Sequence, residues 1–285
     1  MKLSLSGLTR LDFFSRIALY LVILLVVAII VSRYNRTETF QKEMVFIPAG
    51  EFLVGSNDIE TFKNEKKEFG ISQDLFLEDE RPLKKVFINA FYIDMFEVTN
   101  REYKRFIDMT NHPFPPVWKN GIYPAKKDRH PVQNVSWFNA EQFCKWSNKR
   151  LPTEEEWEKA ARGPQRSRYP WGNEFDIKKA NFENGKTLEV GSVEGDKSFY
   201  GVYDMAGNVM EWTSSWYKPY PGFLKKSKKF GKVNKVIRGW SGTDLQHYNL
   251  PRIFGRSSHR HAYPPYQFGD DVGFRCAKDA EKEKR

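Results

Sequence analysis

The sequence predicts an α+β domain with few helices, short strands and much loop, preceded by one N-terminal transmembrane helix. Three observations support this fold class. Residues 17–31 form an unbroken apolar run, three later stretches carry helix-capping signals, and 19 Gly and 15 Pro divide the rest of the 285-residue chain into short segments. A chain of this length forms one large domain or two small ones.

The apolar run, Ile17–Val31, contains no charge, Pro or Gly, and Arg16 and Arg33 flank it. A helix rises ~1.5 Å per residue, so the run is roughly 22 Å long, against a hydrocarbon core of about 30 Å. Ser32, neighbouring aromatic residues and snorkelling arginines can extend it. We therefore predict a transmembrane signal anchor over residues 17–32.

The charges before the anchor predict its orientation. Lys2, Arg10 and Arg16 precede it, so residues 1–16 should form a cytoplasmic tail. No small-x-small cleavage site follows, which favours an uncleaved anchor over the alternative, a protein secreted after signal cleavage. The expected location is the membrane, in a single pass, with a polar linker over residues 33–43 and the domain on the periplasmic or extracellular face.

Two regions have the short apolar pattern of strands. Residues 44–55 predict two short strands around a Pro-Ala-Gly turn, and residues 86–95 predict one strand. Between them, residues 57–80 are charged and predict a loop with some helix. Strands this short suit a domain in which loops make up much of the chain.

Three helices are predicted from the capping residues Thr99, Ser136 and Thr153. Glu102 and Glu156 complete capping boxes at the first and the third. The helices should run through residue 108, through residue 146 and up to Gly163. No further helix of any length is expected after Gly163.

The net charge of +10 favours an anionic partner or an anionic membrane surface. No zinc-finger or RNA-recognition pattern is present, so no nucleic-acid partner is expected. A run of lysines extends from Lys218 to Lys235. Such a run is typical of a solvated, mobile loop. The alternative, functional interpretation is that it attaches the protein to anionic lipid or to an acidic polymer. This stretch has no acid and contains Lys218, Lys225, Lys226, Lys228, Lys229, Lys232 and Lys235.

The chain has two cysteines, Cys144 and Cys276. In an oxidising compartment they could close a long loop, which would contribute about 4 kcal/mol. They could equally be two buried thiols that act as small apolar side chains. Their spacing does not decide between these interpretations.

Several segments occur in an order that resembles the formylglycine-generating enzyme, or sulfatase-modifying factor, family. They are FIPAGEFLVGS (46–56), FYIDMFEVTNREYKRFI (91–107), the long segment HPVQNVSW to KAARG (130–163), YPWGNEF (169–175), YGVYDMAGNVMEWTSSWY (200–217), VIRGWS (236–241) and GFRCA (273–277). The likeness assigns residues 44–277 to one domain and residues 278–285 to a charged tail. It implies a C-type-lectin-like fold and a structural disulfide between Cys144 and Cys276.

The resemblance also implies a structural Ca²⁺ at the turn GNVMEW, with ligands at Asp204, Gly207, Val209 and Glu211. Six to eight oxygens suit this hard cation. The alternative is a turn satisfied without metal, in which Asn208 bonds its own backbone. A second family calcium site would begin at Asn181 and Phe182, but the acidic loop that completes it is shortened here.

The chain departs from the family where copper would bind. Two family cysteines after an RGGS motif hold Cu(I), a soft ion that suits thiolates. Here the segment reads RGWSGTDLQHYNLPRIFGRS, and the two positions fall near Thr243 or Asp244 and near Tyr248 or Asn249; none of these is a cysteine. No Cu(I)-dithiolate site is therefore expected. The candidate residues of the altered groove are Asp244, His247, Tyr248, Asn249, Arg252 and Arg256.

Histidines and carboxylates take the place of thiols in this region. His259 and His261 are candidate ligands of a transition metal, Fe(II), Zn²⁺ or Cu²⁺, with Asp270 and Asp271 nearby in sequence. The alternative, which we favour, is a solvated loop rich in Pro and Tyr. The resemblance gives a structural role to the family arginines Arg238, Arg252, Arg256 and Arg275.

Three functions are compatible with these residues. The first is an extracytoplasmic binding or assembly module that keeps the scaffold without the copper thiols and has a protein or peptide partner. The second is an oxidoreductase, or a protein- or metabolite-modifying enzyme, with a His/carboxylate metal in the family groove. The third, sulfatase activation by formylglycine formation, is disfavoured by the missing thiols. Activity depends on the site and not on the fold, so whether the chain is an enzyme stays open.

Overall fold

The computed structural model describes residues 19–27, 44–58, 78–182, 185–242 and 250–281, together with Asn64 and Lys67. The chain divides into two units, Met1–Glu43 and Met44–Arg285, and each is described by itself. The groove residues Asp244, His247, Tyr248 and Asn249 lie outside the described residues, as does the end of the tail at 282–285.

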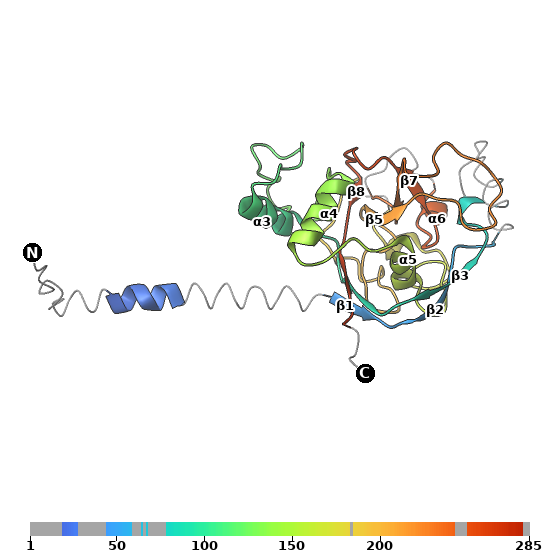
Figure 1. The fold of residues 1–285 in the computed structure, drawn as a ribbon, viewed down its shortest axis with the longest axis horizontal. Helices are drawn as coiled ribbons and strands as arrows, with labels where there is room; N and C mark the ends of the chain where they lie inside the picture. The colour runs from blue at the N-terminus through green and yellow to red at the C-terminus, as the bar shows by residue number, and fades with distance from the viewer. Residues whose placement is uncertain are drawn as a thin grey trace, which may run out of the picture. The chain divides into compact units, whose positions relative to one another are not determined.

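In the first unit, residues 19–27 are helical (Figure 1). All of their side chains are exposed, and none carries a charge. Within the described ranges, no helix combines the length and the apolar character needed to cross a membrane. The rest of the expected anchor over residues 17–32, the tail at 1–16 and the linker at 33–43 lie outside the described residues.

Two small antiparallel sheets contain the first four strands of the second unit. One has the order β1-β4-β9, and the other pairs β2 with β3. Their bounds are Met44–Ile47 (β1), Gly50–Val54 (β2), Lys84–Ile88 (β3), Phe91–Asp94 (β4) and Ala277–Asp279 (β9). The two strands expected around the Pro-Ala-Gly turn are therefore present, and each pairs in a different sheet.

The prediction of a single strand over residues 86–95 is wrong. The chain turns at Asn89 and Ala90, so that β3 ends in one sheet and β4 begins in another. The apolar pattern gives no sign of this break, because Ile88, Phe91 and Ile93 on its two sides are all buried.

A third sheet has four strands in the order β7-β6-β5-β8. Its strands are Met210–Trp216 (β5), Lys235–Arg238 (β6), His261–Tyr263 (β7) and Val272–Gly273 (β8). β5 pairs antiparallel with β6 and parallel with β8. This sheet carries Glu211, Arg238 and His261 on neighbouring strands, so it positions several of the candidate site residues.

Three α-helices begin where their capping residues predict, over Asn100–Thr110 (α3), Trp137–Trp146 (α4) and Glu154–Arg162 (α5). Each has a complete capping box. In α5, Glu156 accepts a hydrogen bond from the N–H of Thr153 at 2.8 Å, and the Thr153 hydroxyl accepts one from the N–H of Glu156 at 3.2 Å. Shorter turns of helix lie at Glu78–Glu80 (η1), Ile177–Lys179 (η2) and Pro251–Phe254 (α6).

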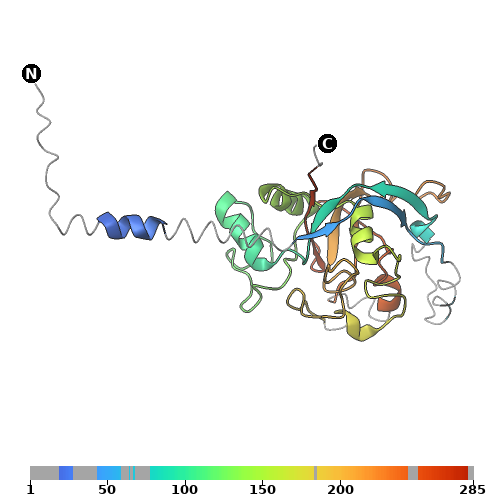
Figure 2. The same cartoon turned by 90° about the horizontal axis from the view of Figure 1, so that it is seen from below.

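Helix α5 packs against β2, β5 and β6 in the interior of the second unit (Figure 1). Figure 2 shows β2 and β3 as a long curved ribbon beside this helix. Trp157 of α5 is fully buried and packs in one cluster with Ile47 and Phe91. The predicted disulfide is confirmed: Cys144 of α4 is bonded to Cys276, which precedes β9, with a Cα–Cα distance of 5.7 Å.

Candidate functional site

Arg238, the last residue of β6, is fully buried and bonded to α5. Its guanidinium donates to Glu154 at 3.2 Å and to Glu158 at 3.0 Å. It also donates to the backbone carbonyls of Ser257 and His259, at 3.2 and 3.1 Å. A buried charge needs both a counter-ion and hydrogen bonds, so this network holds the segment before β7 against α5.

Glu80 is the next buried charge in this region. It accepts hydrogen bonds from Arg256 at 2.9 and 3.1 Å and from the hydroxyl of Ser258 at 2.7 Å. Burial alone would raise the pKa of Glu80, but Arg256 and His259 hold it at about 2. A permanently charged carboxylate therefore lies next to the two candidate histidines.

His259 and His261 are in direct contact. The Nδ1 atom of His259 lies 3.1 Å from a carboxylate oxygen of Glu80, and its Nε2 atom lies 2.8 Å from Nε2 of His261. Burial lowers the pKa of His259, although Glu80 opposes this effect, so the ring is neutral near pH 7. A neutral His259 that donates from Nδ1 to Glu80 keeps a lone pair on Nε2, which accepts the Nε2–H of His261.

A solvated loop is the wrong description of these histidines. His259 is 3% exposed and His261 is half-buried. The ring of Phe254 lies 4.9 Å from His259 and 5.7 Å from His261, and it stacks on Trp240 at 5.0 Å. Trp240 and Phe254 thus form an apolar wall beside the pair. Among the residues that the structure describes, no three His, Cys, Asp or Glu side chains are grouped as metal ligands.

Asp79 is the neighbour of Glu80 in sequence but has the opposite electrostatic behaviour. Tyr217 donates its hydroxyl to Oδ2 of Asp79, and Oδ1 has no hydrogen-bond partner in the described part of the chain. Burial raises the pKa of Asp79 to about 7, against the opposing effect of Arg260. Asp79 can therefore take up a proton near neutral pH, while Glu80 stays charged.

The turn expected to bind calcium brings its predicted ligands together only in part. Asp204 is buried, and its Oδ2 accepts the N–H of Gly191 at 2.6 Å. Gly207 and Val209 are buried in the turn that leads into β5. Glu211 is neutralised already by Arg275, which donates to it at 2.7 Å, and it also accepts the indole N–H of Trp157 at 2.9 Å.

Glu97 lies against Asp204, and no sequence pattern singled it out. Burial and the charge of Asp204 raise the pKa of Glu97. The amide of Asn208 donates to Oε1 of Glu97 at 3.1 Å, whereas Oε2 has no partner among the described residues. Since Asp196 is also buried nearby, this cluster has more carboxylates than Arg275 can neutralise. Such an excess favours a bound proton or a bound cation.

Asn181 and Phe182, proposed from the sequence as the start of a second calcium site, are both buried. The amide of Asn181 donates to the carbonyl of Lys186 at 3.0 Å and to Oδ1 of Asn208 at 3.2 Å. Phe182 packs on Phe175 at 5.7 Å. The side chain of Asn208 is therefore hydrogen-bonded to the side chains of Asn181 and Glu97. The metal-free alternative predicted instead that it would bond its own backbone.

Two of the six groove candidates are described. The backbone carbonyl of Arg252 accepts the hydroxyl of Tyr169 at 2.6 Å, and its guanidinium lies 5.5 Å from the ring of Phe175. Arg256 is buried on Glu80. Both arginines therefore brace the segment around α6.

The lysine run divides into six exposed side chains and one buried side chain. Lys235 is 4% exposed and lies between Trp137 and Trp216, at 3.9 and 4.0 Å from their ring centroids. Burial lowers the pKa of Lys235 to about 8. The exposed ones are Lys218, Lys225, Lys226, Lys228, Lys229 and Lys232. The positive surface is therefore smaller than the sequence suggests.

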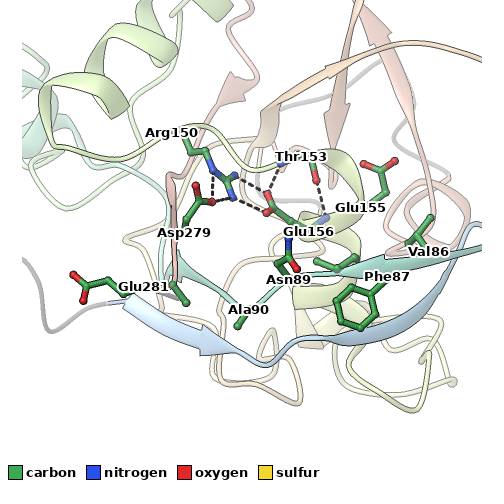
Figure 3. A pocket seen from close by; sticks show the side chains of 12 residues that line it. Val86, Phe87, Asn89, Ala90, Arg150, Thr153, Glu155, Glu156, Asp279 and Glu281 are labelled. Carbon is green, nitrogen blue, oxygen red and sulfur yellow. Dashed lines mark hydrogen bonds and ion pairs between the residues drawn. The ribbon is translucent and has the colours of Figure 1, made fainter. Parts of the chain in front are cut away.

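A surface cavity of about 650 Å³ was not indicated by any motif (Figure 3). It lies between the end of β3, the start of α5 and the chain after β9, and residues 86–90 and 279–281 line it with Arg150, Thr153, Glu155 and Glu156. Arg150 donates to Glu156 at 2.6 and 2.7 Å and to Asp279 at 2.9 Å. Sequence alone could not find this cavity, because its walls come from three distant segments.

Small sheets, few helices and the order of the motifs define a formylglycine-generating-enzyme-like domain. The family description "sulfatase-modifying factor enzyme 1-like domain" matches residues 32–280, so the chain belongs to this family. Its structure is similar to that of PvdO from Pseudomonas aeruginosa, with a TM-score of 0.62 and 26% identity, over 83% of this chain and 94% of PvdO.

Two curated relatives are similar to this chain over most of its length. The serine/threonine-protein kinase Pkn1 of Chlamydia trachomatis is 33% identical over 283 residues, which are 88% of this chain and 42% of the kinase. The chain thus spans about two fifths of that relative's length. The mouse protein named inactive C-alpha-formylglycine-generating enzyme 2 is 29% identical, over 85% of this chain and 87% of that protein.

Proposed function

We propose that this chain is a membrane-anchored, extracytoplasmic binding or assembly module that keeps the family scaffold and does not form formylglycine. The observation that supports this most is the disulfide. The chain contains two cysteines, and they are bonded to each other and fully buried. No thiolate of this chain is then left to hold Cu(I).

The helix of residues 19–27 supports the membrane anchor, because an exposed and wholly apolar helix is stable only when lipid or protein covers it. The buried disulfide supports an oxidising location outside the cytoplasm. Fractionation tests both points. The full chain should stay with membranes in carbonate, and protease added to intact cells or spheroplasts should digest the domain after residue 43.

The ancestral reaction is tested directly with the purified chain, a Cu(I) salt, oxygen and a cysteine-containing sulfatase peptide. We expect no aldehyde, as measured by mass spectrometry and hydrazide capture, while an active formylglycine-generating enzyme in parallel converts the same peptide. Aldehyde formation by this chain that requires Cys144 or Cys276 would refute the proposed module.

A second candidate function is metal-dependent modification chemistry at His259 and His261. The observation that favours it is the convergence of their Nε2 atoms at 2.8 Å, with Glu80 on the other nitrogen of His259. Metal-binding histidines commonly bond a carboxylate in this way. Stoichiometric Fe, Zn or Cu that is lost in His259→Ala and His261→Ala, but kept in His112→Ala, would support this function over the module.

We propose a structural Ca²⁺ at the turn before β5, with Asp204 and the carbonyls of Gly207 and Val209 as ligands. The excess negative charge around Asp204 and Glu97 supports it, whereas Glu211 does not fit, because Arg275 already neutralises it. Ca²⁺ should raise the melting temperature of wild type. It should have no such effect on Asp204→Asn.

The exposed lysines from Lys218 to Lys232 are proposed to attach the domain to an anionic surface. Each lysine near a charged bilayer contributes up to about 1 kcal/mol. Replacement of Lys225, Lys226, Lys228 and Lys229 by Gln should remove salt-sensitive binding of residues 37–285 to phosphatidylserine vesicles.

A further inference from the structure

Strand β3 has an open edge that faces the cavity. Among the strands of the described residues, it pairs with β2 alone. Residues 86–90 line the cavity without interruption, so the backbone forms this wall, since successive side chains of a strand point to opposite faces. Within the described part of the chain, residues 85–89 have no backbone hydrogen bonds apart from their pairing with β2. At ~3.3 Å per residue, this wall is roughly 16 Å long.

The wall opposite β3 is acidic. Glu155, Glu156, Asp279 and Glu281 contribute to it, and Arg150 is the one cation among the lining residues that the structure describes. Arg150 is shared between Glu156 and Asp279, and Lys84 pairs with Glu155 at 2.8 Å. Among the described residues, four carboxylates therefore face two cations, which is a local excess of negative charge on a chain with a net charge of +10.

Phe87 adds an apolar contact to this surface. Phe87 lies within β3 beside the cavity (Figure 3). Its side chain is 67% exposed. An exposed aromatic on an unpaired edge strand is a feature that monomeric domains usually avoid, because it invites another strand. A strand laid along β3 would cover this ring and use the free backbone groups together.

We propose that this cavity binds an extended, basic peptide, which adds to the open edge of β3 as a new strand. This inference rests on the proposed function as a binding module and gives the chemistry of its partner. Backbone hydrogen bonds to β3 supply affinity, and Lys or Arg at alternate positions of the peptide pair with Glu155 and Glu281. The two groove candidates that the structure describes, Arg252 and Arg256, do not line this cavity.

The probe is a fluorescent peptide of about six residues, the usual length of a strand, in which Val and Lys alternate. A peptide of alternating Val and Glu is the charge control. Both are titrated into the full chain in detergent, and amide hydrogen exchange at residues 85–89 is followed with and without peptide. The Lys peptide should bind at least about tenfold more tightly than the Glu peptide, given two or more ion pairs. It should also slow exchange in β3.

Matched variants separate the charge from the strand edge. Glu155→Gln with Glu281→Gln should weaken binding about fivefold, whereas Glu189→Gln, an exposed carboxylate outside the cavity, should leave it unchanged. In an antiparallel pair, alternate N–H groups face the partner strand. Val86 and Phe87 are neighbours, so the N–H of one of them faces the cavity. Replacing that residue by proline (Val86→Pro or Phe87→Pro) removes this N–H, and the variant should fold normally but no longer bind the peptide.

Three results would overturn the proposal: equal binding of the two peptides, no binding, or binding without slower exchange at residues 85–89. The proposal would also be overturned if the amides of residues 85–89 exchange slowly without peptide and this slow exchange depends on protein concentration. The same holds if the slow exchange is lost when residues 282–285 are deleted. A second copy, or the chain's own end, would then occupy the edge. The aldehyde assay is a separate measurement. If the chain makes no aldehyde and binds no peptide, only the proposal that a peptide adds to β3 is refuted.

Discussion

Arg275 and Glu211 form an ion pair at 2.7 Å in which the two side chains are 0% and 1% exposed. The guanidinium of Arg275 also donates to the backbone carbonyls of Met95 and Tyr203, at 3.2 and 2.8 Å. One side chain thus connects β5, the turn after β4 and the segment between β8 and β9. This is the arrangement that removes Glu211 from the predicted calcium ligands.

Arg275→Met should be strongly destabilising. It leaves the Glu211 carboxylate buried without its cation, which typically costs about 3–5 kcal/mol. Arg129→Met is the control, because its pair with Glu189 is half exposed, at 50% and 54%, and should lose less than about 1 kcal/mol. Urea unfolding followed by tryptophan fluorescence measures both. Similar losses in the two variants would contradict the importance of this pair.

Loss of the disulfide should reduce stability by about 4–5 kcal/mol, because the bond closes a loop with a sequence separation of 132. The double variant Cys144→Ala with Cys276→Ala tests this in urea without reductant. Wild type treated with dithiothreitol should approach the variant. An unchanged midpoint in both samples would show that the bond does not constrain the unfolded chain.

Asp79 should make stability depend on pH. Its pKa is raised from 3.8 to about 7 in the folded protein. At pH values between 3.8 and about 7, Asp79 keeps a proton in the folded protein that the unfolded chain releases. The protonated carboxyl therefore stabilises the folded protein. This stabilisation is full below about pH 4 and is lost as the pH rises through 7. The loss amounts to at most roughly 4 kcal/mol.

The variant Asp79→Asn isolates this effect, since it keeps a neutral group at every pH. Relative to wild type, its free energy of unfolding should increase from pH 5 to pH 8. Asp108→Asn, at an exposed position of α3, serves as the control and should show no such trend. A difference between Asp79→Asn and wild type that is constant with pH would refute the raised pKa.

The cap of α4 offers a prediction on local structure. Ser136 accepts the N–H of Asn139 at 3.3 Å, and the amide of Asn139 accepts the N–H of Ser136 at 3.0 Å. Ser136→Ala should cost about 1 kcal/mol, whereas Ser136→Thr should cost much less. Thermal melting of the two variants measures the difference. If both melt together, the hydroxyl contributes little.

Local signals in the sequence predicted local structure well. The starts of α3, α4 and α5 were correct, because each cap depends on residues within one turn of helix. The family, its mixed fold and the disulfide were also predicted, from motifs in a fixed order. The split between β3 and β4 was missed, because it depends on which sheet each strand joins.

The burial of charged side chains could not be predicted in the same way. His259 is buried because its partner, Glu80, comes from a segment 179 residues earlier. Lys235 looks like its neighbours in the lysine run, but two distant tryptophans enclose it. Glu97 is one of many acids until the fold brings Asp204 to it. In each case the environment is made by tertiary contacts, which composition and spacing do not contain.

Strands β1 and β9 flank β4 in one sheet, so the polypeptide enters and leaves the domain within about 15 Å. Adjacent entry and exit let a domain be spliced into a longer protein without threading through it. A region similar to this chain makes up 42% of the chlamydial kinase Pkn1. A reporter fused at either flank should therefore leave the interior intact.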